Sequence, residues 1–440
     1  MEGSISKRAT ARQIMWKHRL AQALVATGIV CLAIGTAHAQ SADGGTIDPG
    51  ATRAHIYSHG LMDRDTLTGD WGGARSSMTD KGITFEAVYT GEYFVETSGG
   101  VAHGDGYLDN RDISLELDAE TLWGWHGATW FFYALGNDGN SPSRFVGDAQ
   151  ATSNIETGVY TWKLYEAWLE QKFGEGTSAK LGLIDLNSEF DVTETAGLFL
   201  SSSHGIGPDF SQSGLGGPSI FPTTSLALRL ETHFGENAYL RAGMFDGVSG
   251  DLNNPKGTQV ELHPGKEGWL VTVEAGLQQG LDEDDTRPFH KYALGYWTYT
   301  EDVPATDTVT GNPETGSGFY AIADRALGDN LSAFLRLGMA SDKAYGIGSY
   351  VGTGAVLTGV FGEDDQLGLG IAHAIIGDTL AQSVPAPGLE NAETSIELTY
   401  CTQIAPWLTV QPDVQHVFAP AADPTLDDAT IVSLRFEAAF

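Results

Sequence analysis

Apolar and polar side chains alternate along the end of the chain with a period of two residues. Within 431–440, Val432, Leu434 and Phe436 hold even positions, whereas the odd positions between them are polar or charged. This period predicts a β-strand with one apolar face and one polar face. The C-terminal segment is therefore expected to be a strand lying between a polar and an apolar environment.

The same period recurs over most of the chain, in segments that are mostly about 9 to 12 residues long. Strands of soluble proteins more often have five or six residues, whereas tilted membrane-spanning strands need about ten. The chain also ends on Phe440, and a terminal aromatic strand is typical of outer-membrane barrels, whereas the last residues of soluble domains usually fray. About sixteen such segments are expected, near 83–95, 111–121, 127–136, 161–173, 179–186, 223–234, 237–246, 268–278, 290–299, 318–326, 330–340, 350–360, 365–375, 393–402, 407–418 and 428–440.

These segments predict an all-β fold, a transmembrane antiparallel β-barrel of about sixteen strands over 81–440. In such barrels short periplasmic turns alternate with longer exterior loops. The expected short turns are 123–127, 174–178, 235–237, 327–330, 362–364 and 403–406, and the expected long connections are 96–110, 137–160, 187–222, 247–267, 300–317, 376–392 and 419–427. The connection 279–289 breaks the pattern because it is long and acidic. A soluble sandwich or propeller is the alternative fold.

The polar faces of the strands indicate what such a barrel does. If the apolar faces meet lipid, then charged residues such as Glu116, Arg336 and Asp413 line the lumen. Sixteen strands enclose a lumen wide enough for water. The pattern therefore predicts a hydrophilic diffusion channel.

The N-terminal residues have the pattern of a secretory signal. Basic residues up to Arg19 precede an apolar stretch that ends near Ile34, and Ala37-His38-Ala39 gives an A-x-A cleavage site. We expect a signal peptide over 1–39 and a periplasmic segment at the base of the barrel over 40–80. Beyond residue 40 no apolar run is long enough for a transmembrane helix.

Composition excludes several classes of protein. The formal net charge of −33 repels phosphate backbones, so nucleic acid is not an expected partner. Two cysteines cannot form a disulfide scaffold. The common catalytic motifs for metalloproteases, serine hydrolases and nucleotide-binding loops do not occur, so we expect no enzyme, no catalytic residue and no cofactor. The acidic run 282–285 lacks the ligand spacing of a calcium loop, so no metal site is expected there.

Four stretches resemble the carbohydrate-selective porins of the OprB type. They span most of the chain after residue 40 and are LTGDWGGAR (67–75) with Gly82-Ile-Thr and Tyr89-Thr-Gly-Glu92; YEAWLE (165–170) with GLIDLNSEF (182–190); GPSIFP (217–222); and WLTVQPDVQ (407–415) with the closing 434–440. The resemblance implies a sixteen-stranded outer-membrane porin of a Gram-negative bacterium that passes glucose and related small sugars by diffusion. It also implies that 67–75 lies at the base of the barrel.

Sugar selection by a pore requires polar groups that bond hydroxyls and aromatic faces that meet the C–H side of a sugar ring. On the segment 161–173, two tryptophans and two glutamates share the parity of the polar face, and Arg229 and Glu231 share a face on another segment. Arg75 could reach the lumen from below. The candidate pore-lining residues are Arg75, Glu92, Trp162, Glu166, Trp168, Glu170, Arg229 and Glu231. The connection 187–222 either folds inward as a constriction or lies on the surface.

The expected partners are small sugars, outer-membrane lipid and lipopolysaccharide, and the barrel-assembly machinery through Phe440, with a homo-oligomer possible. Two other functions remain open. A strongly negative lumen would concentrate cations and give a general, cation-preferring pore. A secreted β-sandwich acting on glycosides is the other alternative, because that chemistry needs only two carboxyl groups brought together.

Overall fold

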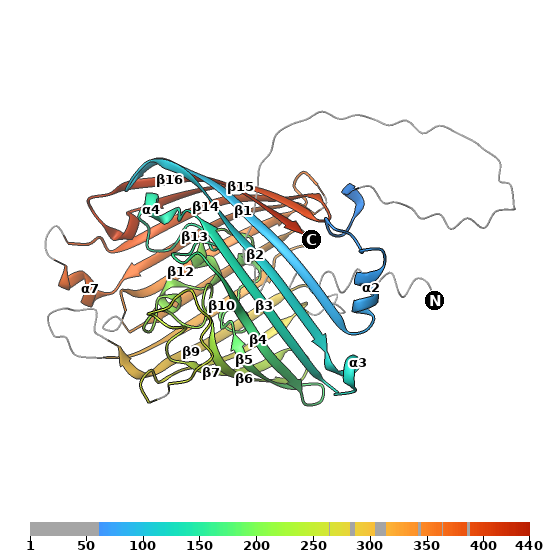
Figure 1. The fold of residues 1–440 in the computed structure, drawn as a ribbon. Coiled ribbons are helices and arrows are strands. Elements are labelled where there is room, and N and C mark those ends of the chain that lie inside the picture. The colour runs from blue at the N-terminus through green and yellow to red at the C-terminus, as the bar shows by residue number, and fades with distance from the viewer. Residues whose placement is uncertain are drawn as a thin grey trace, which may run out of the picture.

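The structure is a computed structural model that describes residues 61–263, 265–281, 287–303, 314–341, 345–362, 364–384 and 388–440. Sixteen antiparallel strands, each paired with its neighbour in sequence, form a barrel that β1 and β16 close (Figure 1). The expected barrel is confirmed, and the sandwich and propeller alternatives are wrong. The expected signal peptide 1–39 and the acidic run 282–285 lie outside the described residues. Within the described residues, no helix is long and apolar enough to span a membrane.

The strands have between 8 and 18 residues. They are β1 (Ile83–Gly100), β2 (Gly104–Asp118), β3 (Ala128–Gly139), β4 (Trp162–Lys172), β5 (Thr177–Ile184), β6 (Ser225–Phe234), β7 (Ala238–Asp246), β8 (Trp269–Gln279), β9 (His290–Val303), β10 (Glu314–Ala326), β11 (Leu331–Ala340), β12 (Ile347–Thr358), β13 (Gln366–Ile376), β14 (Ala392–Ala405), β15 (Leu408–Phe418) and β16 (Asp427–Ala439). Short helical segments occupy the connections and the N-terminal base: η1 (Leu61–Asp63), α2 (Ala74–Thr79), α3 (Ala119–Trp123), α4 (Ser143–Val146), η2 (Thr195–Leu198), α5 (Ser202–Gly205), α6 (Pro208–Ser211), α7 (Asp378–Ser383) and η3 (Pro420–Ala422).

The two-residue period of the sequence sorts side chains between the two faces of the barrel wall. On β6, Leu230 is 50% exposed, whereas the adjacent Arg229 is 4% exposed and bonds to residues inside the barrel. The two strands that close the barrel also sort their side chains by face. Phe436 and Leu434 of β16 lie opposite Gly91 and Tyr93 of β1, so these residues share one face of the wall. The apolar face is therefore the outer one, and the charged face points inward.

The connections differ in length at the two ends of the barrel, as expected. Figure 1 shows α2, α3 and the C-terminus at one end and α7 at the other. The end with α3 has the shorter turns, such as 173–176 and 235–237, and is the periplasmic end by the rule for these barrels. The expectation of a long connection over 96–110 is wrong, because β1 and β2 continue pairing as far as Glu96 and Gly104 and join through 101–103.

The N-terminal base segment packs at the periplasmic end of the barrel. The amide of Leu67 donates to the carbonyl of Ala439 at 2.7 Å. The guanidinium of Arg75, on α2, donates to the main-chain oxygen of Phe440 at 2.5 Å. These bonds hold the last residues of β16 against the start of the described chain, at the seam where the barrel closes.

The connection 185–224, which we call the inner loop, folds into the lumen. Its Phe210 ring stacks on Trp297 of β9 with 4.7 Å between centroids and 2° between planes. Its Phe199 ring lies 5.9 Å from that of Phe334 on β11. The main apolar core of the molecule is therefore inside the barrel, between this loop and the wall. Of the two expectations for this connection, an inward fold and a position on the surface, the inward fold is correct.

Candidate pore constriction

Polar side chains of the barrel wall hold the backbone of the inner loop. A buried backbone N–H that lacks an acceptor destabilises a fold, so a loop inside a barrel needs partners from the wall. Carboxylates on four strands accept hydrogen bonds from backbone N–H groups at four points along the first half of the loop. Glu166 of β4 accepts from Asp185 at 3.3 Å, Glu274 of β8 from Asp191 at 3.0 Å, Asp324 of β10 from Thr195 at 2.9 Å, and Glu397 of β14 from Ser201 at 3.0 Å.

Arg336 of β11 fixes the middle of the inner loop. Its guanidinium donates to both carboxylate oxygens of Asp191, at 3.1 and 2.6 Å, and also to Asp209. All three side chains are at most 4% exposed. The guanidinium also lies over the rings of Tyr320 and Tyr350, at 5.6 and 5.4 Å from their centroids. A single side chain, Arg336, therefore holds two separate parts of the inner loop, at Asp191 and at Asp209, against the wall.

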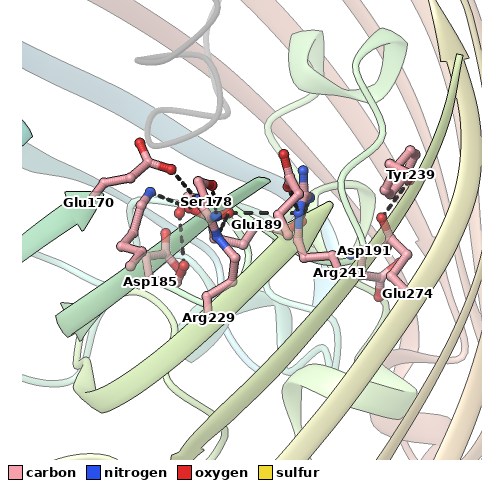
Figure 2. A network of polar contacts seen from close by, with 12 residues as sticks. Glu170, Ser178, Asp185, Glu189, Asp191, Arg229, Tyr239, Arg241 and Glu274 are labelled. Atoms are coloured by element: carbon pink, nitrogen blue, oxygen red, sulfur yellow. Dashed lines mark hydrogen bonds and ion pairs between the residues drawn. The ribbon is translucent and has the colours of Figure 1, made fainter. Parts of the chain in front are cut away.

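A second charged network joins the loop to β4, β5, β6 and β7 (Figure 2). Glu189 of the loop forms ion pairs with Arg229 of β6, at 2.8 Å, and with Lys180 of β5. Arg229 also donates to Glu170 of β4 at 2.7 Å. Arg241 of β7 donates to the carbonyl of Glu189. Each cation thus contacts a group of the loop or a neighbouring carboxylate, and Glu189 is at the centre of the network.

The ionised form of Glu189 is strongly favoured. Burial alone would raise the pKa of this carboxyl, but Arg229, Lys180 and Arg241 together outweigh burial and lower the pKa to about 2. The group carries its negative charge at any neutral pH. The carboxylate that these ion pairs share is therefore ionised near pH 7.

The network has an accessible edge on β6 and β7. Arg241 donates to Glu231, and His233 contacts the same carboxylate at 2.8 Å. The side chains of Arg241, Glu231 and His233 are 14%, 16% and 33% exposed, compared with 4% for Arg229. The groups nearest to lumen solvent are therefore at this edge.

Five of the expected pore-lining residues meet in or beside this network: Glu166, Trp168, Glu170, Arg229 and Glu231. Trp168 donates to Glu166 at 3.0 Å, while Lys180 lies 4.1 Å from the centre of its ring and Phe131 stacks on it at 4.9 Å. With 7% of the residue exposed, the indole has little surface left for a sugar. Its contacts place it in the wall packing beside the loop.

Trp162 is not a lumen residue, and its expected position is wrong. A β-bulge in β4 shifts the register, so that Tyr133 pairs with Glu166 but Ala134 pairs with Leu164. The extra residue reverses the parity of the strand on one side of the bulge. Trp162 is consequently 51% exposed, on the face opposite to buried Lys163. The sequence period could not show this, because a bulge is a property of the strand pair.

Glu92 and Arg75 lie away from the network. Glu92 of β1 is buried and pairs with Arg435 of β16 at 2.7 Å, and Ser153 of the connection 140–161 donates to it at 2.9 Å. Glu92 therefore anchors a second inward connection. Arg75 stacks over Trp71 at 4.6 Å and bonds to Phe440, so it lies at the base of the barrel, as expected, without reaching the inner loop.

The residues that sequence reasoning missed are chiefly Lys180, Glu189, Asp191, Asp209 and Arg241. The parity of β5 and β7 could have indicated Lys180 and Arg241. The three acidic residues belong to the inner loop, which has no period from which a face can be assigned. Among the described residues, no group of His, Cys, Asp or Glu has an arrangement that could hold a metal ion.

Comparison with known proteins identifies the family. The model of the carbohydrate-selective porins of the OprB family matches residues 102–440. The chain belongs to the OprB family. It is thus an outer-membrane porin of Gram-negative bacteria, a channel and not an enzyme, and the glycoside-acting sandwich is excluded.

Individual relatives are distant. Porin B of Pseudomonas aeruginosa is 24% identical over 422 residues, which cover 85% of this chain and 91% of that protein. A putative porin QuiX of Acinetobacter baylyi is 23% identical over 86% of this chain and 94% of its own length. The high-pH structure of Pseudomonas putida OprB superimposes with a TM-score of 0.76 at 21% identity and covers 87% of this chain and all of that one. The structural likeness supports the fold of this OprB-family porin.

Proposed function

We propose that this porin passes glucose and related small neutral sugars by passive diffusion alongside the inner loop. The observation that supports the proposal is the charge-paired network around Glu189. Its cations Lys180, Arg229 and Arg241 contact Glu170, Glu189 and Glu231, so hydrogen-bonding groups of both signs are fixed while their charges compensate. Such a surface can form hydrogen bonds with sugar hydroxyls without strongly attracting either cations or anions.

Within the network, we assign sugar contact to the accessible edge and to Glu170 of β4, whose side chain is the next most exposed carboxylate of the network. Glu231 and Arg241 have side chains exposed by 16% and 14%, and Glu170 by 12%. Arg229 and Glu166 are more deeply buried and mainly hold the loop. A sugar moving past the loop would therefore exchange water hydrogen bonds for bonds to Glu170, Glu231 and Arg241.

The test is single-channel current through the refolded porin in planar bilayers, with and without glucose. We expect millimolar-range glucose to reduce the open-channel current, and Arg241→Gln to weaken this block severalfold. Arg325→Gln is the matched control, because Arg325 lies on β10 with an exposed side chain that bonds to Tyr292 outside the lumen. A channel blocked equally in both variants would contradict the assignment of the edge.

A general, cation-preferring pore is the second candidate, and the excess of 57 acidic over 24 basic residues favours it. A negative lumen raises the local concentration of cations. The reversal potential in a salt gradient separates the two functions. A strong cation preference together with a current that no sugar reduces would establish the general pore and refute the sugar path.

A further inference from the structure

A hollow lies at the exterior end of the barrel, next to the inner loop. It has a volume of about 560 Å³ and is bounded by the connection 247–267 between β7 and β8, by Leu215 of the inner loop and by the outer end of β9 near Tyr299. We call it the outer hollow. It lies at the end opposite the short turn 235–237, which is the side from which a solute enters. No residue of the network around Glu189 lines it, so it is separate from the constriction.

The outer hollow has a fixed shape because the connection 247–267 is anchored to another part of the barrel. Nζ of Lys163 on β4 donates to the carbonyl of Pro255 at 3.1 Å, and also to the hydroxyl of Thr223 in the inner loop at 2.8 Å. The hydroxyl of Thr258 donates to the carbonyl of Leu164, also on β4, at 2.8 Å. One buried lysine thus joins the connection, the wall and the inner loop. A site that is already in place binds a ligand without the entropic cost of ordering a loop.

Part of the lining of the outer hollow is aliphatic. The inner loop approaches the connection 247–267 closely at Gly216, where a Cβ would lie 2.7 Å from Cδ2 of Leu252. Leu252 is nevertheless 52% exposed, and Leu215 is 48% exposed. These two side chains therefore leave apolar surface free for a ligand, and the C–H groups of a sugar ring can make van der Waals contacts with it.

The rest of the lining carries groups that can bond hydroxyls. Asn253, Asn254 and Gln259 each have an amide that both donates and accepts hydrogen bonds. Oε1 of Gln259 is buried and has no hydrogen-bond partner among the described residues, so a ligand that brings a donor is favoured there. Acidic side chains outnumber basic ones in the lining, which disfavours anionic ligands such as sugar phosphates; they are Asp251, Glu261, Glu267, Glu301 and Asp302, against Lys266.

We propose that the outer hollow is a capture site for uncharged disaccharides at the exterior mouth of the porin, an inference that rests on the proposed sugar function. Its amides and carboxylates bond the hydroxyls, while Leu215 and Leu252 meet the C–H groups. Its volume lies within the range of about 300–1,000 Å³ for sites that hold a drug-sized ligand. A disaccharide is of that size, whereas a single sugar ring leaves much of the hollow to water. Because the hollow adjoins the inner loop, a captured sugar is held next to the constriction.

Equilibrium dialysis of the full porin in detergent against radiolabelled maltose, an uncharged disaccharide, tests the proposal. We expect saturable binding in the millimolar range, and binding at least tenfold weaker in Gln259→Leu and in Asn253→Leu. Asp427→Leu is the matched control, because Asp427 is an exposed polar residue at the exterior end of β16 and does not line the hollow. Single-channel conductance shows that each variant barrel is folded. No saturable binding, or equal binding in all three variants, would overturn the proposal.

The variant Arg241→Gln separates this inference from the proposed function. It is expected to weaken the block by glucose at the constriction and to retain maltose binding, because Arg241 does not line the outer hollow. Glucose block without maltose binding would refute the capture site alone, whereas maltose binding without glucose block would refute the sugar path at the constriction alone. If Arg241→Gln removes maltose binding while Gln259→Leu keeps it, then the disaccharide binds at the constriction and the capture site is refuted.

Discussion

Replacing Arg336 by Met should release the middle of the inner loop. The change leaves the carboxylates of Asp191 and Asp209 buried without the cation that both contact. Breaking a buried pair in this way costs about 3–5 kcal/mol. Such a loss shifts the balance between the held and the released loop by about two to three and a half powers of ten. The other anchors, at Glu274 and Glu397, remain, so the barrel itself stays folded.

Single-channel recording measures this effect directly. We expect Arg336→Met to give a larger and noisier conductance and a weaker block by glucose, because the loop then fluctuates between positions. The control is the triple variant Arg336→Met with Asp191→Asn and Asp209→Asn, which removes the unpaired charges and should restore much of the quiet conductance. If the single variant conducts like the natural chain, then Arg336 does not hold the constriction and the reasoning fails.

Three further results are expected. The folded-state pKa of Glu189 is lowered to about 2, so the stabilisation that its charge gives the inner loop is complete above about pH 5 and is lost as pH falls toward 2. Current noise should therefore rise below about pH 3. The variant Glu189→Gln should abolish this pH dependence. Arg435→Met should loosen the connection 140–161, because the buried carboxylate of Glu92 then lacks its cation. Adding Glu92→Gln should recover the resistance of this connection to limited proteolysis. Arg75→Ala removes a charged hydrogen bond to Phe440, so the heat-induced unfolding midpoint in detergent should fall by an amount equivalent to about 1.5–3 kcal/mol, with the exposed Arg64→Ala as control.

The barrel could be predicted because the property that defines it is local. The two faces of a strand can be recognised from the alternation of apolar and polar residues within that strand alone. Segments such as 223–234 could therefore be predicted without knowing which strands lie beside them. The prediction failed where the period stops. Beyond Glu96, β1 carries Thr97 and Ser98, so no apolar face marks the strand although it still pairs with β16. Trp162 was misplaced for a related reason, since the bulge that turns it outward depends on β3.

The constriction was less accessible to sequence reasoning because its contacts join distant residues. Arg336 and Asp191 are 145 positions apart, and nothing in the loop sequence around Asp191 indicates which strand it will meet. Parity correctly indicated that Glu166, Glu170 and Arg229 point inward. It could not indicate whether the space inside holds water or a loop.

That difference changes how the charge of the pore is understood. A carboxylate that faces water contributes its full charge to the field in the lumen, but one that accepts backbone N–H groups or pairs with a buried cation contributes much less. Glu274 and Glu397 are bonded to loop amides, and Glu189 contacts Lys180 and Arg229. The net charge of −33 therefore overstates the attraction of the pore for cations, and the few exposed groups at the edge of the network have a larger share in selecting what passes.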